Sequence, residues 1–84
     1  MSAPAPGQRT IDGLVHKANL IARYFASQPR ADAVVEAADH IHKFWEPRMR
    51  AQAYAWLDAG GGGLEPVARQ ALERLRLEKP PPSS

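Results

Sequence analysis

Helix-ending residues divide the middle of the chain into four short segments, and this division constrains the fold more than any other feature. The breaks are Gln-Pro-Arg at residues 28–30, Pro47 and the glycine run at residues 60–63. Each segment between them repeats apolar residues at three- and four-residue steps, which is typical of amphipathic helices. No run alternates with the β-branched enrichment of a strand. The sequence therefore predicts an all-α fold, a compact bundle of four short helices.

Each predicted helix has a local start signal. Thr10 can cap the first helix and Asp32 the second. Pro47 ends the second helix and opens the third, with Glu46 as its cap. Pro66 opens the fourth helix. The four apolar faces comprise Ile11, Leu14, Val15, Ala18, Ala22 and Phe25; Val34, Ala38, Ile41 and Trp45; Met49, Ala53, Trp56 and Leu57; and Leu64, Val67, Ala68, Ala71 and Leu75. The four-residue spacing also predicts ion pairs on the last helix from Glu65 to Arg69 and from Arg69 to Glu73.

The two ends differ in composition from the middle. Residues 1–9 and 79–84 combine proline, glycine and serine with little apolar surface, so we expect disordered tails around a single helical domain at residues 10–78. The first nine residues lack the apolar core of a signal peptide, and no apolar run approaches the roughly 20 residues that a membrane span needs. We therefore expect no membrane association and a cytoplasmic location.

The charge and cysteine content argue against several classes of protein. Net charge is only +2, and acidic residues alternate with basic ones along the chain, so no basic face of the kind that binds nucleic acid is expected. The sequence contains no cysteine, which excludes disulfides and thiolate metal sites.

The residues that often carry chemistry have structural explanations here. His40 and His42 lie about 200° apart around a helix, so their imidazoles cannot share a metal ion. The glycine run at 60–63 follows no predicted strand and precedes no Lys-Ser/Thr pair, so we interpret it as a helix end rather than a phosphate loop. Carboxylates are not paired in an apolar setting. We predict no catalytic, cofactor-binding or metal-binding residue in this chain.

Two features break local rules and are candidates for partner binding. Arg48 and Arg50 lie in the opening turn of the third helix, where the helix dipole disfavours cations. One interpretation is that both arginines project toward acidic or carbonyl groups of another protein, with Tyr54 extending that surface. The alternative is a structural pair between Glu46 and Arg50 with Arg48 simply solvated.

The second feature is an apolar pair on the far side of the first helix. Leu20 and Tyr24 lie about 180–220° from Ile11, so they cannot join the same core stripe. Either a partner protein covers them, or the fourth helix of the chain itself does.

The stretch FWEPRMR at residues 44–50 resembles the delta subunit of the soluble, molybdenum-containing, NAD-dependent formate dehydrogenases of bacteria. KANLIARYF at 17–25 and GLEPVARQAL at 63–72 extend the resemblance, which runs from about Leu14 to Leu75. It implies a small helical subunit without a cofactor of its own. The other subunits would carry the molybdenum cofactor, iron-sulfur clusters, FMN and the NAD site.

This resemblance implies a noncatalytic accessory subunit that docks on the large catalytic subunit and supports its assembly, stability or cofactor loading. It leaves open whether the free subunit associates with itself. The rival hypothesis is a stand-alone helical regulatory or nucleic-acid-binding domain, which the interleaved charges argue against. We expect the aromatics and methionine of the 44–50 stretch to set the helix junction and its arginines to face outward. The predicted partner-binding residues are Phe44, Trp45, Pro47, Arg48, Met49, Arg50, Tyr54, Leu20 and Tyr24.

Overall fold

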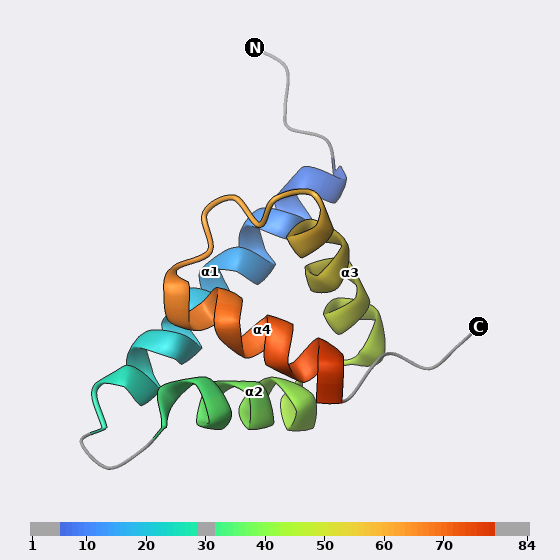
Figure 1. The fold of residues 1–84 in the computed structure, drawn as a ribbon. Coiled ribbons are helices and arrows are strands. Elements are labelled where there is room, and N and C mark those ends of the chain that lie inside the picture. The colour runs from blue at the N-terminus through green and yellow to red at the C-terminus, as the bar shows by residue number, and fades with distance from the viewer. Residues whose placement is uncertain (1–5, 29–31, 79–84) are drawn as a thin grey trace.

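The computed structural model describes residues 6–28 and 32–78, which contain four helices and no strand. The helices are α1 (Pro6–Ala26), α2 (Ala33–Phe44), α3 (Pro47–Asp58) and α4 (Pro66–Glu78). In Figure 1, α1, α2 and α3 frame a roughly triangular space, and α4 lies across it. α4 packs on each of the other three helices, most extensively on α2, and α1 packs on both α2 and α3. This arrangement confirms the predicted all-α fold.

The local start signals of α2 and α3 are confirmed. The Asp32 carboxylate accepts hydrogen bonds from the backbone amides of Val34 at 3.1 Å and Val35 at 3.3 Å, which satisfies two free donors of the first turn. Glu46 occupies the capping position of α3 and Pro47 follows it, although the Glu46 side chain makes no capping bond. The chain therefore turns sharply between α2 and α3.

α1 begins earlier than predicted. Its first residue is Pro6 rather than one following Thr10, so residues 6–9 extend the helix instead of belonging to a tail. Proline suits a helix start because its φ is already helical and its missing amide would have had no partner there. Residues 1–5 and 79–84, the rest of the predicted tails, lie outside the described residues.

The core is built largely from alanines that let the helices approach closely around a few large side chains. Ile41, Leu72 and Leu75 are the largest fully buried residues. Leu72 was missed in the sequence analysis, although it stands four residues after Ala68 on the same stripe of α4. The buried residues comprise Leu14, Ala18, Ala22, Ala37, Ala38, Ile41, Trp45, Ala53, Tyr54, Ala68, Ala71, Leu72 and Leu75.

The glycine run after α3 is held by side chains from three helices. Trp56 Nε1 donates to the Gly62 carbonyl at 2.8 Å, and Arg69 Nη2 donates to the carbonyls of Gly60 at 3.0 Å and Gly61 at 3.1 Å. Asn19 Nδ2 donates to the Gly63 carbonyl at 2.9 Å. The run therefore ends α3, as predicted, and also connects α1, α3 and α4.

These bonds correct the predicted ion pairs of α4. Arg69 binds backbone carbonyls rather than Glu65 or Glu73. Glu65 instead pairs with Arg23 of α1, which raises the pKa of Arg23 and lowers that of Glu65. Spacing along one helix could not reveal a partner on another helix.

Replacing Gly63 with alanine should lower the free energy of unfolding by about 1–2 kcal/mol. Gly63 has a φ of +85°, and a Cβ there would lie 3.3 Å from Val15 Cγ1. Gly62 is the matched control, because its φ is not positive and its Cβ would make ordinary contact with Trp56. Urea denaturation should show Gly62→Ala to be neutral or slightly stabilising. A Gly63 variant as stable as the Gly62 variant would contradict this account.

Candidate partner-binding surface

At the corner between α2 and α3, some side chains pack in the core and others lie at the surface. Trp45 is only 7% exposed and packs in the core, and Met49 is half-buried against it. Pro47 and Arg48 are exposed, and the Phe44 side chain is 70% exposed. Trp45 and Met49 thus anchor the junction, as predicted, whereas Phe44, which was also expected to set it, faces solvent together with Pro47 and Arg48.

Arg50 and Tyr54 do not face outward, and this part of the prediction is wrong. Arg50 is 9% exposed and Tyr54 is buried. Both lie on the inner face of α3, because residues 50, 53, 54 and 57 follow the spacing of a core stripe. The spacing could have revealed this, but the charge of Arg50 favoured an outward assignment.

The Arg50 guanidinium is buried without a carboxylate partner among residues 6–28 and 32–78. Its Nη1 lies 3.2 Å from His42 Nδ1, and its Nε is buried with no hydrogen bond. Because a guanidinium in a protein is always protonated, His42 Nδ1 must act as the acceptor. The predicted alternative, a pair with Glu46, does not form, since the only bond between those residues joins the Arg50 amide to the Glu46 carbonyl. Arg50 therefore carries a desolvated charge.

Tyr54 places a second buried polar group beside Arg50. Its hydroxyl is buried next to the Arg50 guanidinium, although no partner meets full hydrogen-bond geometry. Burial raises the pKa of the Tyr54 hydroxyl, whereas the charge of Arg50, its polar contact with the hydroxyl and the charge of Arg76 act to lower it. Arg76 itself forms a salt bridge with Asp58 at 2.6 Å, so its charge is compensated whereas that of Arg50 is not.

A row of side chains on α1 and α2, here called the aromatic strip, comprises Leu20, Tyr24, Phe25, His40 and Phe44. The ring centroids of Tyr24 and Phe25 lie 5.0 Å apart, those of Phe25 and His40 5.9 Å, and those of His40 and Phe44 4.6 Å. Leu20 stands one turn before Tyr24 on the same face of α1. Leu20 is 48% exposed and Tyr24 62% exposed, so α4 does not cover them. The strip is therefore an open apolar surface that spans two helices.

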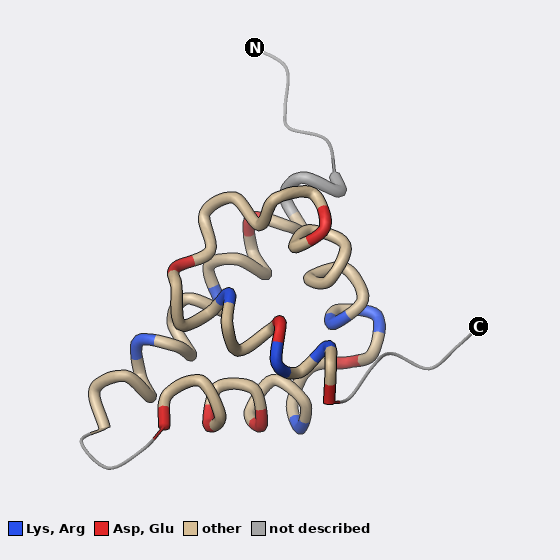
Figure 2. Tube along the Cα trace, in the orientation of Figure 1, with Lys and Arg blue, Asp and Glu red and all other residues tan. Residues whose placement is uncertain are grey.

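An acidic edge on α2 borders the aromatic strip. It consists of Asp32, which caps α2, and of Glu36 and Asp39, all three exposed. Figure 2 shows acidic residues, in red, spaced along this helix. Lys43 forms a salt bridge with Asp39 at 2.9 Å, and Asp39, with a smaller effect of Glu36, raises the pKa of Lys43. One positive charge thus offsets only part of the negative charge along this edge.

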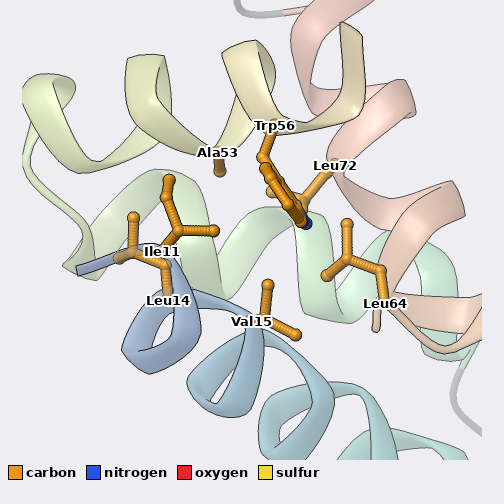
Figure 3. Close-up of a pocket in the computed structure, with 7 residues that line it drawn as sticks. All are labelled: Ile11, Leu14, Val15, Ala53, Trp56, Leu64 and Leu72. Carbon is orange, nitrogen blue, oxygen red and sulfur yellow. The ribbon is translucent and has the colours of Figure 1, made fainter. Parts of the chain in front are cut away.

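An apolar pocket between α1, α3 and α4 offers little space for a bound molecule. The apolar pocket shown in Figure 3 has a volume of about 10 Å³, room for roughly one water molecule. It is lined by Ile11, Leu14, Val15, Ala53, Trp56, Leu64 and Leu72. Because these walls are apolar, the pocket is a packing gap in the core rather than a ligand site.

The described histidines and carboxylates do not gather into a site. His40 lies against Phe25 and Phe44, whereas His42 contacts Arg50, so the two imidazoles diverge as predicted. No group of three or more potential metal ligands occurs among residues 6–28 and 32–78. None of the described helices is both long enough and apolar enough to cross a bilayer.

The family profile of the NADH-dependent formate dehydrogenase delta subunit FdsD matches residues 13–72. The chain belongs to this family. The matched range includes the whole aromatic strip, and it confirms the resemblance carried by residues 17–25, 44–50 and 63–72. No curated protein and no solved structure matches the chain.

Proposed function

We propose that this delta subunit is a noncatalytic accessory subunit that docks on the large, molybdenum-containing subunit of a formate dehydrogenase and supports its assembly, stability or cofactor loading. The observation that carries the proposal is the match to the delta subunit family over residues 13–72. The open aromatic strip gives further support, because an exposed apolar patch on a small protein often marks a protein-protein contact.

The predicted partner-binding residues have two roles in this proposal. Five of them are exposed and would touch the partner directly, and these are Leu20, Tyr24, Phe44, Pro47 and Arg48. The remaining four hold the corner from inside the fold, and they are Trp45, Met49, Arg50 and Tyr54. Mutation of this second group would affect docking by disturbing the shape of the corner.

The chemistry of the complex would reside in other subunits. Those subunits would hold the molybdenum cofactor, iron-sulfur clusters, FMN and NAD, and this chain would bind none of them. We place the complex in the cytoplasm. The delta subunit would then support the complex by covering part of the surface of the large subunit.

Co-expression with an affinity-tagged large subunit tests this function. We expect the delta subunit to co-purify with the large subunit and to increase its yield or molybdenum content. The delta subunit purified alone should carry no stoichiometric metal or flavin and should not oxidise formate. A large subunit that fails to bind it, and that reaches the same yield and molybdenum content without it, would contradict the proposal.

A further inference from the structure

We propose that the aromatic strip is the main contact of this subunit with the large subunit, and that it fits an apolar pocket there bordered by lysine or arginine side chains. The inference rests on the proposed function and adds the contact surface and the chemistry of the partner. It follows from the exposed area of the strip, the arrangement of its rings and the charges beside it.

The exposed area comes mainly from three side chains. Leu20, Tyr24 and Phe44 are 48%, 62% and 70% exposed. Together they leave on the order of 400 Å² of mostly apolar surface in water, within the range of functional patches on single-domain proteins. Burial of this surface against an apolar pocket would be favourable in proportion to the area removed from water.

The rings are held in place before any partner binds. Phe25 is half-buried and contacts Tyr24 with the ring planes at 77° and His40 at 62°. His40 in turn lies against Phe44 with the ring planes at 37°. Because neighbouring rings restrict the rotamers of Tyr24 and Phe44, these side chains would lose little conformational entropy on docking. Rigid, well-packed aromatic residues are typical of binding hot spots.

The acidic side chains on the α2 side of the strip indicate which charge the border of the partner pocket should carry. Asp32, Glu36 and Asp39 line α2, and of these only Asp39 has a lysine partner, Lys43, among the described residues. Surfaces that associate specifically tend to carry complementary charge around the contact. The pocket that receives Phe44 and Tyr24 should therefore have basic side chains on the border that meets α2.

A second copy of this chain is a poor occupant of the strip. Two copies joined through the strip would each bury on the order of 400 Å², about half of what each partner contributes to a typical stable interface. A second copy would also present the same acidic edge rather than a basic border. A larger partner can reach further surface at the exposed Pro47 and Arg48, which follow Phe44 closely in the chain.

The first test replaces the exposed rings. We expect the Tyr24→Gln/Phe44→Gln double variant of the full chain to bind the purified large subunit about 100-fold more weakly than wild type. Leu77→Gln is the matched control, because Leu77 is an 85% exposed apolar residue of α4 outside the strip. The control should bind within about twofold of wild type. Thermal melts of both variants should stay close to wild type, since the replaced side chains are exposed.

The second test reverses a charge. Glu36→Lys should slow association with the large subunit by about tenfold at low ionic strength, and added salt should reduce the difference. Glu73→Lys is the control, since Glu73 is an exposed carboxylate of α4, a helix that contributes no residue to the strip. It should change the association rate much less. A Glu36→Lys variant that associates as fast as wild type would exclude the basic border.

The outcomes separate this inference from the proposed function. If wild type binds the large subunit and the double variant binds equally well, the strip is not the contact, but the subunit role stands. If wild type does not bind, the proposed function itself fails. If light scattering shows a dimer of the free chain that the double variant abolishes, the strip is a self-association surface and the inference is overturned.

Discussion

Replacing Trp45 with alanine should lower the free energy of unfolding by about 3–5 kcal/mol, the usual effect of truncating a large buried aromatic residue. Trp45 is 7% exposed and directly follows α2, where its amide bonds to the Ile41 carbonyl at 2.9 Å. Its loss would leave a cavity in the core and remove the anchor of the turn into α3. Small domains have total stabilities near the lower end of about 5–15 kcal/mol, so much of the variant would be unfolded at 37 °C.

Phe44→Ala is the matched control for the Trp45 variant. The two aromatics are adjacent in sequence, but Phe44 is 70% exposed and contacts His40 at the surface. Its truncation should change the free energy of unfolding by less than about 1 kcal/mol. Urea denaturation followed by far-ultraviolet circular dichroism compares the two directly. Equal midpoints for wild type and the Trp45 variant would show that Trp45 does not support the core.

Replacing Arg50 with methionine should raise the free energy of unfolding by about 1–3 kcal/mol, because an apolar side chain of similar length would fill the site without a buried charge. The Arg50 guanidinium is 9% exposed, and its neighbours are the uncharged acceptor His42 Nδ1 and the Tyr54 hydroxyl rather than a carboxylate. Such a contact compensates only part of the cost of removing a guanidinium from water. The melting temperature should rise by several degrees.

Arg48→Met controls for the loss of a positive charge in the first turn of α3. Arg48 is exposed, so its replacement should change stability by no more than about 0.5–1 kcal/mol, mainly through the helix dipole. Differential scanning calorimetry of both variants gives the comparison. If Arg50→Met melts below wild type, the Arg50 contact with His42 contributes more stability than desolvation of the charge removes.

The helix boundaries could be predicted largely because their signals are local. Asp32, Pro47 and Pro66 act on the turns that contain them, and the structure places helix starts beside all three. Pro6 is the same kind of signal, but the proline- and glycine-rich composition around it favoured a tail. The charge of Arg50 favoured an exposed side chain, whereas its place on one helical stripe with Ala53 and Leu57 favoured a buried one. The side chain is buried, as the stripe indicates.

The candidate surface could be predicted only in part. The exposure of Leu20 and Tyr24 followed from their position opposite the core face of α1, which helical spacing reveals. Their continuity with Phe44 depends on Phe25 of α1 meeting His40 of α2, a contact set by how the two helices cross. No periodicity within one helix contains that information. The same holds for Arg23 and Glu65, which pair across a gap of 42 residues.

The position of α4 bears on how the protein folds during synthesis. Of the four described helices, α4 leaves the ribosome last, yet it packs on all three of the others and supplies the fully buried Leu72 and Leu75. Until α4 emerges, α1 can pack on α2 and α3, but the faces of these three helices that α4 covers stay exposed to water. The described domain should therefore fold only after α4 is translated, and a partner subunit that recognises the folded surface must bind after that point.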